Sequence, residues 1–448
     1  MKQRRWAAPP APGPVHATIT LPGSKSLTAR YLVLAALAKG PSRLKGALDA
    51  DDSRLMAASL EQLGTRVETN STHWDVHPGP VVAGGDIQIG LAGTVMRFLP
   101  PVAALAAGPV RFDGSTAAGA RPIRPLLEAL GRLGVNISLP AGSGSLPFTV
   151  TGTGQLTGGH TTLDARLSSQ FLSALLLAAP AYSQGLSISL EPAVLPSRPH
   201  VEMTLAALAT FGANGAETSP YAWTIQPGGL TGKTIQVEPD LSNAAPFLAA
   251  AVVAGGTIRI PNWPAQTTQP GALLPQFLTA FGARTSLRDG TLELTSPGLL
   301  PDSGDDLDAP GWTPNQRHPD QAPAGPICLD LSAAGELAPC LTALGALSGV
   351  PFELTGIAHL RGHETDRLAA LATEIARLGG SAEQTTTGLR LSPAPLSGTL
   401  LQTYGDHRMA QFGAIIGLAI PGVELDDVSV TAKTLPSFTN LWEQLWPR

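Results

Sequence analysis

A run of apolar and small residues that ends in glycine recurs six times along the chain. The terminal glycines are Gly40, Gly108, Gly185, Gly256, Gly349 and Gly422, which lie 68, 77, 71, 93 and 73 residues apart. Each run predicts a helix that stops at a turn. A short strand-like segment follows each run, as in VRFDGS at 110–115 and LSISLEP at 186–192.

A second predicted helix follows each strand and ends at a further glycine. These glycines are Gly64, Gly134, Gly212, Gly282 and Gly379, and the sixth second helix is expected over 437–446. Glycine adopts the left-handed conformation past a helix end without strain. The pattern predicts six units of about 70 residues, arranged as two domains of three, because solenoid repeats are shorter, at roughly 20–50 residues. Chance recurrence of Ala- and Leu-rich helices is the alternative, and the near-regular spacing disfavours it.

One interval is longer than the others because it contains residues 301–326, which are rich in Pro, Asp and Gly. This composition predicts a loop insertion inside the fifth unit, without a catalytic role.

Composition narrows the class of protein. A length of 448 residues exceeds one ordinary core, and 43% hydrophobic with 14% charged residues is typical of a well-buried globular protein. A net charge of −5 argues against a general nucleic-acid binder. Cys328 and Cys340 form neither a disulfide framework nor a metal-binding spacing. Apolar stretches fall short of the ~20 residues of a membrane span, and no apolar segment follows the basic N-terminus, so we expect a cytoplasmic protein.

Candidate chemistry lies where predicted strands run into helices. The segment PGSKSLTAR at 22–30 places Lys25 beside the first N–H groups of a helix, which is an anion-binding arrangement. Arg30, about one turn further on, could clamp a carboxylate. The spacing is not that of a P-loop.

Similar boundaries recur along the chain, one or two in each unit. They are AGTVMR at 92–97, ARPI at 120–123, SSQF at 168–171, SRPH at 197–200, EPDLSN at 238–243, GE at 335–336, RGHETDR at 361–367, DHRM at 406–409 and TAKT at 431–434. Each alone is weak, because Asp–Arg pairs are usually solvated salt bridges and serines often cap helices. Their shared position predicts one site for anionic ligands in an acidic protein. Its cations would be Lys25, Arg30, Arg121, Arg367, Arg408 and Lys433.

These motifs, in this order and over nearly the full chain, resemble those of the 5-enolpyruvylshikimate-3-phosphate synthases, the 3-phosphoshikimate 1-carboxyvinyltransferases. The resemblance implies an α/β protein with the enolpyruvyl transferase fold, a two-domain inside-out α/β barrel in which each domain holds three βαβαββ repeats. The first domain would span 23–239, on the shikimate 3-phosphate side. The second would comprise 1–22 and 240–448, on the phosphoenolpyruvate side.

The resemblance also implies a reaction. The family transfers the enolpyruvyl group of phosphoenolpyruvate to the 5-hydroxyl of shikimate 3-phosphate and releases phosphate, in the shikimate pathway of aromatic amino-acid biosynthesis. It implies small-molecule substrates, no cofactor, no metal, no nucleic acid and no membrane, and we expect a monomer.

Site residues carry over by motif. Shikimate 3-phosphate would contact Lys25, Ser26, Arg30, Ser168, Ser169, Gln170, Ser197, Glu336 and His363. Phosphoenolpyruvate would contact Lys25, Gly93, Arg121, Gln170, Arg367, Arg408 and Lys433. Proton transfer would fall to Glu336, Lys25, Glu364 and His407, and the sequence does not divide the roles among them.

Several positions depart from the family's best-known pattern. Glu336 replaces an Asp, His363 a Lys, His359 an Asn, His200 a Tyr and Leu91 an Asn. These changes bear on contacts to the shikimate hydroxyls and leave the reaction in place. The family also binds glyphosate at the phosphoenolpyruvate site, and Gly93 leaves room there that an alanine would fill, which predicts sensitivity.

Two alternatives remain. UDP-N-acetylglucosamine enolpyruvyl transferases share the fold and the donor, but they carry a reactive Cys where this chain has Thr116, and they lack the DHRMA segment. A non-catalytic anion-binding protein on the same fold is the other alternative, although Glu336, Glu364 and His407 are all present.

Overall fold

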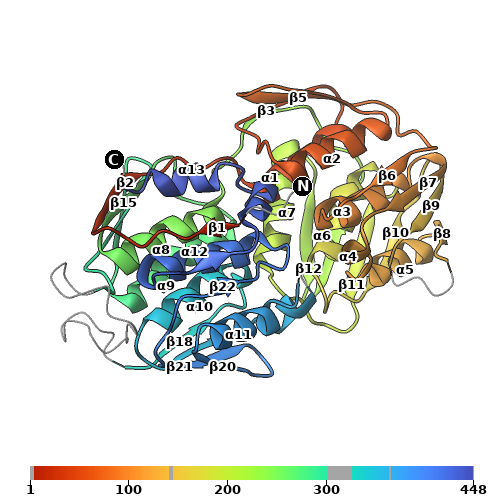
Figure 1. Ribbon diagram of the computed structural model, residues 1–448. Coiled ribbons are helices and arrows are strands. Elements are labelled where there is room, and N and C mark those ends of the chain that lie inside the picture. Colours follow the sequence, from red (N-terminus) through yellow and green to blue (C-terminus); the bar gives the residue numbers. More distant parts are fainter. Residues whose placement is uncertain (1–4, 141–144, 301–324, 363–364, 447–448) are drawn as a thin grey trace. The chain divides into compact units, whose positions relative to one another are not determined.

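The computed structural model describes residues 5–140, 145–300, 325–362 and 365–446. The chain forms two compact units (Figure 1). The continuous unit is Pro22–Glu238, and the split unit combines Met1–Leu21 with Pro239–Arg448. Most of the predicted 301–326 insertion, residues 301–324, lies outside the described residues.

Three four-stranded sheets of one design make up the strands of the continuous unit. In each sheet the first two strands are parallel, and a closing hairpin adds two antiparallel strands in the order first, second, fourth, third. One sheet contains β6 (Asp86–Gln88), β7 (Ala107–Asp113), β8 (Asn136–Ser138) and β9 (Phe148–Thr153). The next contains β10 (Gly159–Leu163), β11 (Leu186–Leu190), β12 (Gly215–Ser219) and β13 (Ala222–Ile225). The third contains β14 (Thr234–Gln236), β3 (Ser42–Lys45), β4 (Arg66–Thr69) and β5 (His73–His77).

The split unit repeats this design, and its N-terminal segment supplies strands to two sheets. One sheet contains β2 (Val15–Thr18), β15 (Gly256–Ile260), β16 (Arg284–Arg288) and β17 (Thr291–Ser296). Another contains β18 (Ile327–Asp330), β19 (Phe352–Thr355), β20 (Ser381–Gln384) and β21 (Leu389–Ser392). The last contains β22 (Leu400–Leu401), β23 (Glu424–Leu425) and β1 (Trp6–Ala7). In the continuous unit β14, from its C-terminal end, therefore completes the sheet of β3, β4 and β5, and in the split unit the N-terminal strands β2 and β1 complete two sheets.

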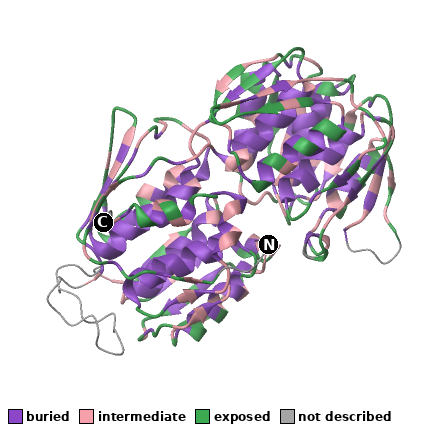
Figure 2. Cartoon of the chain, turned by 45° about the horizontal axis from the view of Figure 1, so that its top comes forward, coloured by how far each residue is buried: buried purple, intermediate pink, exposed green. Residues whose placement is uncertain are grey.

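The first helix of each repeat lies inside its unit. In the continuous unit these helices are α1 (Lys25–Leu37), α3 (Gly93–Ala103) and α6 (Gln170–Ala178), and in the split unit they are α8 (Ala245–Ala254), α10 (Ala338–Leu347) and α12 (His407–Ala419). The three helices of each unit contact one another pairwise. Every residue of α3, α8, α10 and α12 is buried, as expected for helices without a polar face (Figure 2). The helices form the core and the sheets enclose it.

The second helix of each repeat buries one face only. These helices are α2 (Asp51–Gln62), α5 (Arg124–Arg132), α7 (Pro199–Phe211), α9 (Leu274–Leu278), α11 (Arg367–Arg377) and α13 (Phe438–Glu443). The five glycines predicted to end second helices all have φ between 84° and 98°, which confirms the predicted stops. A short helix, α4 (Thr116–Gly119), precedes α5. Among the described residues, no helix combines the length and the apolar character needed to cross a membrane.

Candidate active site

In the continuous unit, the N-terminal ends of α1, α3 and α6 lie together. Arg97, the fifth residue of α3, donates a 2.8 Å hydrogen bond to Oε1 of Gln170, the first residue of α6. Arg30, the sixth residue of α1, donates to Oγ of Ser173 over 3.5 Å. Helix N-termini carry partial positive charge, so three of them side by side favour an anion.

Lys25 is placed by the turn that opens α1. Ser24 caps the helix by accepting a hydrogen bond from the Leu27 N–H over 3.4 Å. At Gly23 an added Cβ would collide with the Gly46 carbonyl oxygen, so the turn requires glycine. The Lys25 ammonium lies 3.4 Å from Oδ2 of Asp52, a carboxylate that is itself buried. The lysine is therefore held at the helix start that the sequence predicted.

Gly93 and Arg121 are in direct contact. The Arg121 guanidinium donates to the Leu91 carbonyl over 3.0 Å and lies so close to Gly93 that an added Cβ would be 2.5 Å from its terminal nitrogen. Within the described part of the chain, Nε of Arg121 and Oγ1 of Thr94 are buried without a hydrogen-bond partner. Buried polar groups are normally paired, so these two are available to an anion at the start of α3.

The serine pair lies at the start of α6. Oγ of Ser168 accepts from the Gln170 N–H over 3.2 Å and from Arg97 over 3.4 Å. Ser169 is buried. Ser197, in the next strand-to-helix turn, has a φ of 50°, a left-handed conformation that is strained for a non-glycine residue. A bidentate ion pair between Arg198 and Glu217, at 2.6 and 3.0 Å, holds the chain beside it.

The Arg30 guanidinium makes several hydrogen bonds within the protein, which the prediction of a carboxylate clamp did not include. Its guanidinium donates to Oγ1 of Thr204 over 2.8 Å, to the Ser26 carbonyl over 2.9 Å and to the His200 carbonyl over 3.0 Å. Burial lowers the pKa of Arg30 to about 9, so the group stays charged at neutral pH. With the Ser173 hydroxyl, internal acceptors face four of its five N–H groups, so a bidentate clamp on a substrate carboxylate would have to replace one of them.

In the split unit, the N-terminal ends of α8, α10 and α12 also lie together. Arg408, the second residue of α12, donates a 2.7 Å hydrogen bond to the carbonyl of Ser242, in the turn that leads into α8. The Cys340 thiol, near the start of α10, donates to the carbonyl of Ala245, the first residue of α8. This unit therefore also presents three adjacent helix starts.

A buried ion pair organises the start of α12. Asp406 caps this helix by accepting from the Arg408 N–H over 2.8 Å, and it also accepts from Arg367 over 2.7 and 3.2 Å. The side chains of Arg367 and Asp406 are 3% and 0% exposed, so this pair is not the solvated salt bridge typical of such sequences. Burial lowers the pKa of Arg408. Lys433, in the turn Val428–Lys433, is also buried.

Two of the predicted proton-transfer groups, Glu336 and His407, lie near these helix starts. Glu336, in the short turn before α10, accepts from Oγ of Ser242 over 3.2 Å. Nδ1 of His407 lies 3.7 Å from Oδ1 of Asp406. The His359 ring packs against Gly335, where an added Cβ would be 2.9 Å from its Nε2. Glu364 and His363 lie outside the described residues.

Sequence reasoning missed two residues that organise the site. Arg97 links the starts of α3 and α6, and Asp406 orients both Arg367 and the first turn of α12. The signal for Arg97 was its position about one turn into the helix that begins at Gly93, as Arg30 lies about one turn into the helix that begins at Lys25. Asp406 stood at a helix start in the DHRM motif, but the sequence carried no signal for its arginine partner, which is 39 residues away.

Comparison with known proteins identifies the family. The family model of EPSP synthase (3-phosphoshikimate 1-carboxyvinyltransferase) matches residues 9–442. A 3-phosphoshikimate 1-carboxyvinyltransferase of Kocuria rhizophila is 47% identical over 459 residues, covering 98% of this chain and 96% of that protein.

Solved structures confirm the predicted fold. An EPSP synthase from Acinetobacter baumannii has a TM-score of 0.76 at 22% identity, with 98% of each chain covered. The enolpyruvyl transferase NikO from Streptomyces tendae has a TM-score of 0.74 at 19% identity, with 97% of this chain and 96% of that chain covered. Family model, relative and fold agree over almost the whole length, and the chain belongs to the EPSP synthase family.

Proposed function

We propose that this chain is a transferase that moves the enolpyruvyl group of phosphoenolpyruvate to the 5-hydroxyl of shikimate 3-phosphate and releases phosphate. The observation that carries the proposal is the family match over residues 9–442, which includes every predicted helix-start motif. The geometry supports it, because both units present clustered helix starts with buried cations. Both proposed substrates are dianions or trianions. When they bind, they leave water, and charged hydrogen-bond donors must replace the water molecules that they lose.

The reaction needs three proton movements and one leaving group. The 5-hydroxyl oxygen forms a bond to C2 of phosphoenolpyruvate while a base removes its proton and an acid protonates the C3 methylene, which gives a tetrahedral intermediate. Loss of the C2–O bond to phosphate, with return of a proton from the new methyl group, restores the double bond. Cations around the phosphate stabilise the charge that develops as it departs.

We assign the shikimate 3-phosphate contacts mainly to the continuous unit. Ser168, Ser169 and Ser197 would hold the 3-phosphate, and Ser26 with Arg30 would bind the carboxylate. Support comes from the position of the serine pair at the start of α6.

We assign the phosphoenolpyruvate contacts by family motif. Lys25, Arg121 and Lys433 would hold the phosphate, with the Gly93 N–H, and the unpaired Nε of Arg121 supports this role. Arg367 and Arg408 would bind the carboxylate, and Gln170 would lie between the two substrates. All of these assignments rest on family motifs and on the local geometry within each unit.

Glu336 is our first candidate for the hydroxyl-side proton, because its carboxylate is held by Ser242 at the start of α8. Lys25 and His407 are the other described candidates, and Glu364 is proposed from the sequence alone. We also propose a monomer in the cytoplasm.

The deciding assay measures phosphate release from phosphoenolpyruvate plus shikimate 3-phosphate, compared with either substrate alone. We expect release only with both. Lys25→Ala and Glu336→Gln should each lower kcat at least about 100-fold, whereas the exposed controls Lys45→Ala and Glu383→Gln should stay within twofold of the unaltered chain. An unaltered chain that binds both substrates but releases no phosphate would favour the non-catalytic alternative.

The sister activity is tested in the same format. UDP-N-acetylglucosamine replaces shikimate 3-phosphate, and phosphoenolpyruvate is kept. Phosphate release with UDP-N-acetylglucosamine but not with shikimate 3-phosphate would contradict our proposal. Thr116, in α4, stands where that family carries its reactive Cys, so we expect no turnover.

A further inference from the structure

A strained turn leads into α12. Residues 402–406 connect β22 to this helix, and Tyr404 and Gly405 have φ values of 55° and 67°. Glycine takes this left-handed conformation freely, but the Cβ of a tyrosine resists it. Such a turn persists where surrounding contacts determine its shape.

Two buried or half-buried carboxylates hold the turn. Glu374 of α11 accepts from the Gln402 N–H over 3.1 Å and from the Tyr404 hydroxyl over 2.6 Å. Asp426 accepts from the N–H and the hydroxyl of Thr403, over 2.9 and 2.8 Å. Three successive residues of the turn are therefore each bound to a carboxylate.

The same helix also holds the far end of the turn. Arg367 and Glu374 are seven residues apart on α11, which is two helical turns and places them on one face about 10 Å apart. Arg367 binds Asp406 where the turn ends, and Glu374 binds Gln402 and Tyr404 where it begins. Helix α11 thus fixes the turn at two points.

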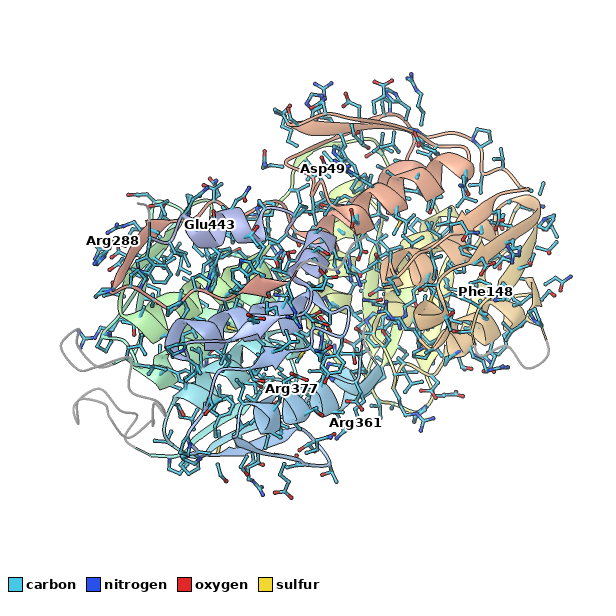
Figure 3. The ribbon with its side chains drawn as sticks, in the orientation of Figure 1. Asp49, Phe148, Arg288, Arg361, Arg377 and Glu443 are labelled. Carbon is cyan, nitrogen blue, oxygen red and sulfur yellow. The ribbon has the colours of Figure 1, made fainter. Side chains whose placement is uncertain are left out.

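The burial of Glu374 favours a specific role. Its side chain is 0% exposed, although a carboxylate is costly to bury unless donors surround it. The third donor, Arg377, contacts it over 3.1 Å from the outer side of α11, where its side chain is 42% exposed (Figure 3). An apolar residue would fill the same space, but it could not orient the turn.

We infer that Glu374 is a positioning residue: with the Tyr404 hydroxyl it sets the turn that presents Asp406, and through Asp406 it orients Arg367 and Arg408 toward the phosphoenolpyruvate carboxylate. This inference rests on the proposed function for the identity of that ligand. Glu374 itself does not need to touch substrate.

The test compares Tyr404→Phe, Glu374→Gln and Glu374→Met with a control, Arg390→Gln, which removes an exposed ion pair between β21 and Glu353 of β19. We expect Tyr404→Phe to raise KM for phosphoenolpyruvate about three- to tenfold, as the loss of one charge-assisted hydrogen bond implies. KM for shikimate 3-phosphate should stay within twofold. The rise in KM for phosphoenolpyruvate should be larger in Glu374→Met than in Glu374→Gln, which keeps one acceptor oxygen, and Arg390→Gln should match the unaltered chain.

Amide hydrogen exchange over residues 403–410 provides a second measurement, independent of turnover. Exchange there should be faster in Tyr404→Phe and Glu374→Gln than in Arg390→Gln. An unaltered chain without phosphate release would end the proposed function, and the exchange comparison would still decide whether Glu374 holds the turn. Equal exchange in all variants, or equal rises in both KM values, would overturn the inference and leave Glu374 as a general stabiliser.

Discussion

Gly93→Ala is the substitution whose effect the structure defines best. The added Cβ would lie 2.5 and 2.7 Å from the two terminal nitrogens of Arg121. Comfortable contacts between such heavy atoms are about 3.5 Å, so the guanidinium must move by roughly 1 Å. The atoms in conflict belong to the end of a side chain, which can yield while the backbone stays in place.

The side chain that must move, Arg121, is a proposed ligand of the phosphate of phosphoenolpyruvate. The 3.0 Å hydrogen bond from Arg121 to the Leu91 carbonyl would stretch, and the unpaired Nε would turn away from its present direction. A misplacement of about 1 Å in a binding group can cost up to 100-fold, so we expect KM for phosphoenolpyruvate to rise roughly 10- to 100-fold. Overpacking should cost about 1–3 kcal/mol of unfolding free energy.

Steady-state phosphate release with each substrate varied in turn measures this effect. Gly131→Ala, in α5, is the matched control, because an added Cβ there meets no described atom within 4 Å. Inhibition by glyphosate should weaken in Gly93→Ala, because the added Cβ displaces Arg121. An unchanged KM for phosphoenolpyruvate in a folded Gly93→Ala chain would refute the reasoning.

Three further predictions concern titratable groups. Asp406→Asn removes the charge that compensates buried Arg367, so unfolding free energy should fall by about 3–5 kcal/mol and Tm by on the order of 10 °C; calorimetry showing a change under 2 °C would contradict this. Burial raises the pKa of the Cys340 thiol to about 12, whereas Cys328 is exposed, so a thiol reagent at pH 8 should modify one cysteine in the native chain and two in urea. Burial and the Glu374 hydrogen bond raise the pKa of Tyr404 to about 12. The contribution of Tyr404 to stability is therefore complete below its unfolded pKa of about 10 and is lost as pH rises toward 12. Urea titrations at pH 8 and 11 should show a smaller fall in unfolding free energy for Tyr404→Phe than for the unaltered chain. An identical fall in both would exclude Tyr404 as the cause.

Local patterns in the sequence determined much of the fold. The six apolar runs became the six inner helices, and the predicted glycine stops have left-handed φ values. These features depend on residues close together in the chain, where helix propensity and the φ preference of glycine act directly. The helix-start motifs were visible for the same reason.

Only the tertiary structure determined which distant strands and side chains pair with one another. The pairing of β1 with β23 and of β2 with β15 joins the N-terminal segment to strands more than 200 residues away. The sequence likewise left open that Arg30 would be enclosed by Thr204 and His200, and that Asp406 would bind Arg367 in a buried pair. Distant partners meet only when whole helices and sheets pack, because the burial that excludes water from such pairs is a property of the assembled core.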